Sequence, residues 1–391
     1  MLGVTDLLRA AHDPAAASAA RAKSPARYGP RTPVASVVVW NITRMCNMTC
    51  PHCYAAAGHT PSPSELSTAE ALDVVRQLAD AGVRIVILSG GEPLLRADVF
   101  ELAAAIRDAG MAPQVSTNGV LIDATAATRL AEAGVQYVGV SIDGTPSFND
   151  RYRGLAGGFA KALAGARHAR RAGMRTGIRT TVTRRNVSQI DDVMDFVADH
   201  EIDRFYVSGL VDAGRGRLLT DDDLDRAEAR SFLDRLFRRA DEWRADEVPT
   251  AVVTGGNDSH GPYLLRWSAR SGVARTRVAR MRALLVERGG NRAGEALLNI
   301  DTRGRVHPDQ FWASAVLGDV RKEPFSRALE HPLRAQLATR ETLLRGRCGQ
   351  CSELGLCRGS HRERAEARSG HRWGSDPACV LLDEEVTEVS A

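Results

Sequence analysis

Six short, β-branched runs alternate with segments of helical period between residues 37 and 210. The runs interpreted as strands are VVVWNIT (37–43), RIVILSG (84–90), PQVSTNG (113–119), QYVGVSIDG (136–144), RTGIRTTVT (175–183) and RFYVSGL (204–210). The helices predicted between them span 67–82, 97–110, 124–133, 157–172 and 188–199. This alternation predicts an α/β fold with a parallel sheet, open or closed, whose chemistry lies at the carboxyl ends of the strands.

Local sequence marks the ends of the first two predicted helices. Ser67 and Glu70 have the spacing of a capping box, in which the side chain of each residue bonds the backbone N–H of the other. Gly82 and Gly110 follow the last residues of the helical pattern, where a glycine commonly ends a helix. Both helices are therefore expected to begin and end near these residues.

Composition excludes several classes of protein. Apolar content of 43% and charged content of 26% are typical of a soluble globular protein. No apolar run reaches the roughly 18 residues of a membrane helix. The N-terminal residues lack the order of a secretory signal, so a cytoplasmic location is expected. A net charge of +4 makes no case for nucleic acid as a partner.

The seven cysteines fall into two groups that are far apart in the sequence. The first group is Cys46, Cys50 and Cys53, on the loop after the first predicted strand. The members of the second group are Cys348, Cys351, Cys357 and Cys379. An odd number of cysteines in a chain without a secretory signal argues against a disulfide framework. Because no cysteine is left over, two metal sites are the economical interpretation.

The first group has one thiol fewer than a closed tetrahedral site needs. Structural zinc uses four protein ligands, and the nearest further candidate, His52, lies inside the loop itself. A [4Fe–4S] cluster on three thiolates leaves one iron open to an external ligand. Zinc stays open as an alternative on spacing alone, but a substrate or cofactor as fourth ligand favours a catalytic site.

The spacing C-x3-C-x2-C in CNMTCPHC, followed by Tyr54, resembles the signature of the radical S-adenosylmethionine (SAM) enzymes. SGGEP at 89–93, at the end of the second strand, strengthens the resemblance. The matching residues are Gly90, Gly91, Glu92 and Pro93. The resemblance implies that SAM chelates the open iron through its amino and carboxylate groups, and that GGEP receives the SAM amine. It also implies reductive cleavage of SAM to a 5′-deoxyadenosyl radical that abstracts hydrogen.

Further strand ends extend the resemblance over residues 36–240. The additional residues that it assigns to SAM binding are Thr117, Asn118, Ser141, Asp143 and Arg179. Arg153, in NDRYRG, is a weaker candidate, and a surface or helix-end charge is the alternative role for both arginines. The fold that the resemblance implies is a partial (β/α)6 barrel of the TIM type.

The C-terminal cysteines supply four thiolates, enough to close a metal site without an external ligand. Four thiolates also suit a zinc ribbon, which stays open as an alternative. The region resembles the SPASM or twitch auxiliary-cluster domains, but has four cysteines where full SPASM domains have about seven. One auxiliary [4Fe–4S] cluster is therefore expected rather than two.

The expected organisation has four parts. Residues 1–35 are Ala-rich and are expected to be flexible, at most an irregular helix. The radical SAM barrel is expected at 36–240, a connecting helical region at 241–298, and a small auxiliary-cluster domain at 299–391. Two amphipathic helical patterns are present, one at 221–247, across the boundary between barrel and connecting region, and one at 270–290.

Longer stretches resemble the NirJ-type enzymes of heme d1 biosynthesis and their relatives in the siroheme-to-heme pathway. The stretches that carry this likeness are VVVWNITRMCNMTCPHCYA, YVGVSIDG, FNDRYRG, AGRGR, NIDTRGRVHPDQFW and CGQCSELGLCRGSHRERA. The resemblance implies an iron tetrapyrrole derived from siroheme as substrate, loss of its propionate side chains, and an electron donor such as flavodoxin or ferredoxin. Gly209 and Asp212 depart from the expected pattern, which leaves the substrate open.

Several side chains are candidates for contacts with such a substrate. Nearly all basic residues are arginine, which binds carboxylates bidentately, although a high-GC genome also explains this bias. The candidate arginines are Arg184, Arg185, Arg215 and Arg217, each with an exposed-surface role as the alternative. His307 is a candidate ligand for the tetrapyrrole iron, or a hydrogen-bonded loop residue.

Two functions of other classes remain as alternatives. A radical SAM maturase of a ribosomally made peptide would use the same barrel and auxiliary domain. That function predicts an N-terminal leader-binding domain, and residues 1–35 are too short and too poor in strand formers for one. A non-catalytic iron–sulfur or zinc protein would leave the GGEP motif without a role.

Overall fold

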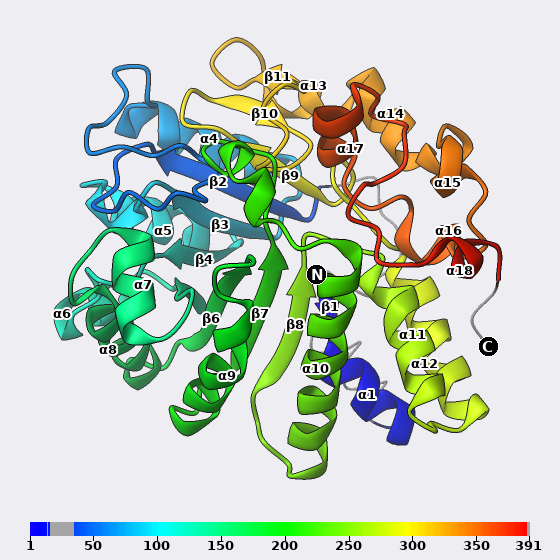
Figure 1. Ribbon diagram of the computed structural model, residues 1–391. Helices are drawn as coiled ribbons and strands as arrows, with labels where there is room; N and C mark the ends of the chain where they lie inside the picture. Colours follow the sequence, from blue (N-terminus) through cyan, green and yellow to red (C-terminus); the bar gives the residue numbers. More distant parts are fainter. Residues whose placement is uncertain (14, 16–34, 389–391) are drawn as a thin grey trace.

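The computed structural model describes residues 1–13, 15 and 35–388 (Figure 1). Within these residues one sheet of eleven strands runs through the molecule, in the order β1-β8-β7-β6-β5-β4-β3-β2-β9-β10-β11. Every pair of neighbours from β8 to β9 in this order is parallel. The sheet is open, with β1 at one edge and β11 at the other.

The six predicted strands form the centre of this sheet, in sequence order. They are β2 (Val37–Thr43), β3 (Ile85–Gly90), β4 (Ala112–Thr117), β5 (Tyr137–Ser141), β6 (Arg175–Val182) and β7 (Arg204–Gly209). The helices that connect them are α4 (Thr68–Asp80), α5 (Val99–Asp108), α6 (Ala124–Glu132), α7 (Pro146–Arg153), α8 (Gly158–Arg171) and α9 (Ile190–Asp199). The predicted α/β fold with a partial barrel is thus confirmed.

Burial follows the pattern of a sheet that is covered by helices. Val38, Trp40 and Ile42 of β2 and Leu88 of β3 are fully or almost fully buried, as expected where a parallel sheet meets protein on both faces. The predicted capping box of α4 is present, since the side chain of Ser67 accepts a hydrogen bond from the backbone N–H of Glu70. The core therefore forms between the apolar residues of the strands and the helices that cover the sheet.

Short strands that the sequence pattern did not reveal widen the sheet on both sides. β8 (Ala251–Gly255) pairs with β7, and β9 (Leu297–Ile300) pairs with β2. β10 (Arg305–His307) and β11 (Gly318–Asp319) follow β9 as antiparallel strands. These runs have two to five residues, too few for periodicity to separate them from loops.

The N-terminal residues correct the expectation of a flexible segment. β1 (Leu2–Gly3) pairs with β8, and α1 (Val4–His12) packs against α10 (Arg226–Ala245) and α12 (Arg275–Arg288). The apolar side chains of α1 are buried, so the prediction is wrong for residues 2–12. Most of the rest of the 1–35 segment lies outside the described residues.

The C-terminal part consists mainly of short helices. They are α11 (His260–Arg270), α13 (Phe325–Leu329), α14 (Pro332–Ala338), α15 (Gly346–Gly349), α16 (Leu354–Cys357), α17 (Arg362–Ser369) and α18 (Asp383–Thr387). The segments from α14 to α18 gather in one corner of the molecule, next to the start of α10 (Figure 1). No helix among the described residues is both long and apolar enough to cross a membrane.

Candidate functional site

The loop after β2 carries Cys46, Cys50 and Cys53 at the carboxyl edge of the sheet. The backbone N–H of Cys46 donates to the carbonyl of Gly58 at 2.6 Å, which closes the loop at its base. Arg215, from the segment after β7, donates to the carbonyl of Cys50 at 2.9 Å and to that of Ala57 at 2.6 Å. Arg215 therefore braces the cysteine loop, which is neither of the two roles, substrate contact or exposed surface, considered for it from the sequence.

Cys46 and Cys50 lie in a setting that favours the neutral form of their thiols when no metal is bound. Burial raises the pKa of Cys46 to about 11, and the nearby Glu92, Cys50 and Cys53 raise it further. Burial also raises the pKa of Cys50, against the charge of Arg153. Thiolates in this loop therefore need a positive partner, which a bound metal cluster supplies.

Gly90 and Gly91 let the end of β3 lie directly against the start of the cysteine loop. The backbone N–H of Gly91 donates to the carbonyl of Thr43 at 2.7 Å, and that of Glu92 donates to the carbonyl of Met45 at 2.7 Å. A Cβ atom on Gly91 would lie 2.1 Å from the carbonyl oxygen of Met45. Only glycine fits here, because any side chain would separate the two segments.

Glu92 joins the ends of two strands. Its carboxylate is fully buried and accepts hydrogen bonds from the Thr117 hydroxyl at 2.7 Å and the Asn118 backbone N–H at 2.8 Å. Burial raises its pKa, and these hydrogen bonds oppose that shift. The side chain of Asn118 also donates to Asn47 of the cysteine loop at 2.7 Å. The predicted SAM-binding residues of β3 and β4 thus form one connected group beside Cys46.

Asp143, at the end of β5, is bonded to the cysteine loop through His52. Its Oδ2 atom lies 3.1 Å from Nε2 of His52 and 2.6 Å from Nη1 of Arg153, and its Oδ1 atom accepts from the Thr181 N–H at 2.9 Å. Burial alone would raise the pKa of Asp143, but the charges of His52 and Arg153 hold it well below its usual range. The loop, β5 and α7 thus share one buried charge network.

Two buried nitrogen atoms of this network have no hydrogen-bond partner among the described residues. They are Nδ1 of His52 and Nε of Arg153. Buried polar atoms in native proteins usually have partners, so both atoms have unused capacity to donate to acceptors of a bound molecule. This is the fit expected of a cofactor with carboxylate and hydroxyl groups beside Cys50.

Tyr54 connects the cysteine loop to β2, to β3 and to the C-terminal part of the chain. Its hydroxyl donates to Oδ1 of Asn41 at 3.0 Å and lies 3.1 Å from Oγ of Ser89. Its ring meets that of Phe311 edge-on, with 5.4 Å between centroids. Asn41 and Ser89 are members of the site that motif reasoning missed, although each lies near a predicted strand end.

The remaining predicted SAM-binding residues lie on adjacent strands. Ser141 of β5 is paired in register with Arg179 of β6. The guanidinium of Arg179 donates to Ser116 of β4 and lies over the ring of Tyr206, 5.4 Å from its centroid. The structure thus brings both residues to the same edge as Glu92, while their contacts with SAM stay a prediction.

The C-terminal cysteines lie on and between α15, α16 and the loop before α18. Burial raises the pKa values of Cys351 and Cys379, and that of Cys357 lies well above its usual value. Cys357 interacts electrostatically with the other three thiols, so the four lie close together. Arg347 lies beside Cys379 and partly offsets its burial.

Other residues proposed for substrate contacts have protein partners. Nδ1 of His307 lies 2.8 Å from the carbonyl of Ala315, and Nε2 lies 3.4 Å from Asp301. Because both ring nitrogens are engaged, His307 has the second of the two roles considered for it, that of a hydrogen-bonded residue, and it lies at the end of β10. Arg184 bonds both carboxylate oxygens of Glu228, Arg185 pairs with Asp222, and Arg217 is exposed.

A cavity of about 390 Å³ opens between the barrel and the C-terminal cysteines. Its walls come from the ends of β6, β7 and β8, the start of α10, one face of α17, and Pro377–Cys379. Arg364 and Arg368 of α17 line it, one turn apart, together with Arg226 of α10. The spacing of Arg364 and Arg368 could have indicated a shared helix face. Gly209 and Asp212, the two residues that depart from the pattern of the NirJ-type enzymes, are both found at this cavity. Gly209 lines it, and Asp212 pairs with Arg368 at 2.8 Å.

Comparisons with known proteins agree with this arrangement. The model of the Radical SAM superfamily matches residues 40–197. The chain is 40% identical to the pre-heme d1 synthase of Dinoroseobacter shibae, over 93% of this chain and 90% of that protein. It is 39% identical to the Fe-coproporphyrin III synthase of Methanosarcina barkeri, over 90% of this chain and 89% of that protein.

A solved structure shares the fold. The crystal structure of Streptococcus suis SuiB bound to precursor peptide SuiA superposes with a TM-score of 0.68, at 18% sequence identity. The match covers 94% of this chain and 79% of that one. At this identity the likeness concerns the fold alone, which extends through the C-terminal region.

Proposed function

The chain belongs to the radical SAM superfamily and is an enzyme, and from this premise we propose that it modifies an iron tetrapyrrole derived from siroheme. The proposed reaction removes propionate side chains, in the biosynthesis of heme d1 or a related heme. The observation that carries the proposal is identity of 40% and 39%, over nearly the whole chain, to two synthases named for tetrapyrrole products.

Family membership implies one [4Fe–4S] cluster and SAM, and Cys46, Cys50 and Cys53 are the residues that would hold this cluster. When bound, the cluster and SAM supply one-electron cleavage and abstraction of a hydrogen atom from an unactivated carbon. The chain keeps the three thiols together through Arg215, and the absence of side chains at Gly90 and Gly91 brings β3 against the loop.

Residues around the cysteine loop fix its position relative to the ends of the strands. Glu92 binds the end of β4 to the end of β3, and Asp143 binds His52 and Arg153. These contacts are buried, so they fix the positions of the cysteines and exclude water from the side of the loop that faces the sheet. Ser141 and Arg179 are proposed to contact SAM from the neighbouring strands.

The second group of cysteines is proposed to hold one auxiliary [4Fe–4S] cluster. The thiol of Cys357 interacts electrostatically with those of Cys348, Cys351 and Cys379, and such a group of four thiols is suited to a polynuclear metal centre. Cys379 lines the cavity of about 390 Å³, so a cluster here would border the substrate. An external flavodoxin or ferredoxin is proposed as the source of electrons.

The cavity combines the features that an anionic, planar substrate requires. Val207, Leu210 and Phe232 provide apolar walls, and Arg226, whose salt bridge to Asp383 is 3.8 Å long, provides a cation. Arg364 and Arg368 also line the cavity, but they are paired with Asp376 and Asp212. Pockets for organic ligands usually span roughly 300–1,000 Å³ and combine apolar walls with a few polar groups. Arginine is the side chain best suited to bind carboxylates such as propionates.

Anaerobic turnover tests the proposal. Reconstituted enzyme is mixed with a didecarboxysiroheme-type iron tetrapyrrole, SAM and dithionite, and products are separated by chromatography and identified by mass. Loss of propionate carbon that depends on SAM is the expected result. Enzyme that cleaves SAM yet neither binds nor alters any siroheme derivative, while it modifies a short peptide encoded nearby, would replace this function with peptide maturation.

A further inference from the structure

His260 begins α11 and lines the cavity of about 390 Å³ between the barrel and the C-terminal cysteines. Thr254 and Gly256 of the β8 end and Ala378 and Cys379 of the C-terminal loop line the same cavity. Only 8% of His260 is exposed. The imidazole is therefore part of the cavity wall and is screened from bulk water.

Its hydrogen bonding is incomplete. Nδ1 of His260 is buried and has no partner within the part of the chain that the structure describes. His307 differs, because its two ring nitrogens lie 2.8 Å from the Ala315 carbonyl and 3.4 Å from Asp301. A buried imidazole nitrogen without a partner is costly in a folded protein, so its place in a cavity wall points to a bound ligand.

The imidazole is neutral near physiological pH. Burial lowers the pKa of His260 to about 4; Arg364 lowers it too, and Asp258 and Asp376 oppose the shift only in part. A neutral ring offers one nitrogen lone pair and one N–H, and the lone pair can bind a transition metal. Arg226, whose only salt bridge among the described residues is long, is the cavity residue best placed to bind a carboxylate.

The arrangement around His260 suits the parts of one kind of molecule. Apolar side chains such as Leu210 and Phe232 form walls for a planar ring, and Arg226 lies on the same cavity with a long salt bridge, 3.8 Å, to Asp383. A neutral imidazole is a usual axial ligand of tetrapyrrole iron. We propose that His260 is the protein ligand to the iron of the tetrapyrrole substrate, an inference that rests on the proposed function.

The test uses ferric coproporphyrin III and metal-free coproporphyrin III as probes with the reconstituted enzyme. Wild type is expected to shift the Soret band of the iron compound and to give the EPR signal of an imidazole-bound ferric tetrapyrrole. His260→Ala should lose this signal and bind the iron compound about tenfold more weakly, and free imidazole should restore the signal. Binding of the metal-free compound should change less than twofold.

Two further variants make the result specific. His260→Gln retains polarity without a good iron ligand and should behave like His260→Ala, with iron–sulfur content equal to wild type as the check on folding. His307→Gln, a change in the histidine whose nitrogens are engaged, should retain the wild-type signal. An unchanged signal in both His260 variants would overturn the inference but leave the proposed function standing. Failure of wild type to bind any tetrapyrrole, with or without iron, would overturn both.

Discussion

Nε2 of His52 lies 3.1 Å from Oδ2 of Asp143, which connects the middle of the cysteine loop to the end of the fifth strand of the sheet. The same carboxylate oxygen accepts a hydrogen bond from Arg153 at 2.6 Å. The carbonyl of Arg153 in turn accepts from the backbone N–H of Thr49 in the loop. The position of the three cysteines thus depends on a buried carboxylate that is not itself a metal ligand.

Asp143→Asn should destabilise the protein and weaken cluster retention, because it leaves the guanidinium of Arg153 buried without its counter-charge. Removal of one partner of a buried ion pair costs about 3–5 kcal/mol. The expected result is a lower urea midpoint by circular dichroism and less iron per chain. Asp108→Asn, in an exposed pair with Arg107, is the control and should change stability by less than about 0.5 kcal/mol.

The effect of Asp143→Asn should depend on pH in a defined direction. The pKa of Asp143 is lowered in the folded protein, so its charge stabilises the fold above the usual carboxyl range, near pH 4. This contribution is lost as the pH falls toward the folded-state pKa. The difference in urea midpoint between wild type and variant should therefore be full at pH 7 and smaller in acid; a constant difference would contradict the charge argument.

Changing Cys46, Cys50 and Cys53 together to Ala should remove one of two clusters. Reconstituted wild type is expected to hold about eight irons and the variant about four, since four thiolates remain elsewhere. SAM cleavage, measured as 5′-deoxyadenosine, should be abolished. A triple variant that still cleaves SAM would refute the assignment of the catalytic cluster to this loop.

Gly91→Ala should disturb the cysteine loop without touching a cysteine. The added methyl group would lie 2.1 Å from the carbonyl oxygen of Met45, so the loop and the end of β3 must separate. Overpacking of this kind costs about 1–3 kcal/mol, and SAM cleavage should fall at least tenfold. Gly58→Ala, where no atom lies within 4 Å of the added carbon, should retain activity close to wild type.

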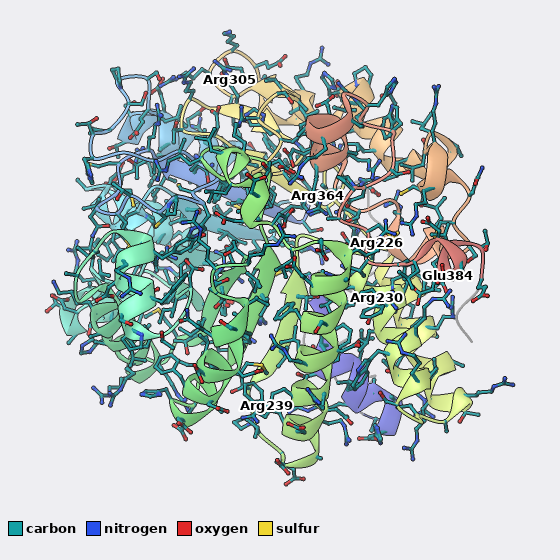
Figure 2. All side chains as sticks on the ribbon, viewed as in Figure 1. Arg226, Arg230, Arg239, Arg305, Arg364 and Glu384 are labelled. Atoms are coloured by element: carbon teal, nitrogen blue, oxygen red, sulfur yellow. The ribbon has the colours of Figure 1, made fainter. Side chains whose placement is uncertain are left out.

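Arg226→Gln should weaken binding of the iron tetrapyrrole by about three- to tenfold, because it removes a cation from the cavity. Its salt bridge to Asp383 is long, 3.8 Å, so little else should change. Arg239 lies further along the same helix, as Figure 2 shows, and is absent from the cavity wall. Arg239→Gln is therefore the matched control. Equal binding by both variants in a titration followed at the Soret band would exclude the role of Arg226.

The sequence predicted the parts of the fold that local periodicity determines. Six strands, their helices and the cysteine loop were located because each has a repeat or a spacing of its own. The buried helix at Val4–His12 was missed because its alanines obscured the apolar pattern of Leu7 and Leu8. β8 and β9 were missed because each is only a few residues long. Their pairing with the neighbouring strands, β7 and β2, defines them as strands, and the sequence pattern does not show this pairing.

Side-chain roles were harder to predict, because partners far apart in the sequence decide them. Arg215 was a candidate for substrate contact or for an exposed surface position, yet it donates to the carbonyl of Cys50, which lies 165 residues earlier. His307 stood in a conspicuous motif but has partners for both nitrogens, whereas His260 stood in none. A histidine or arginine acquires its role from what the fold places next to it.

The contact of Arg215 with the cysteine loop also has a consequence for biosynthesis. The loop is made early, but the residue that closes it follows the last of the six central strands, so the loop cannot be completed until most of the barrel has been synthesised. Contacts of such long sequence separation form late in folding. The three cysteines are therefore synthesised about 160 residues before the side chain that braces their loop, and the loop can take its final form only after residue 215 has left the ribosome.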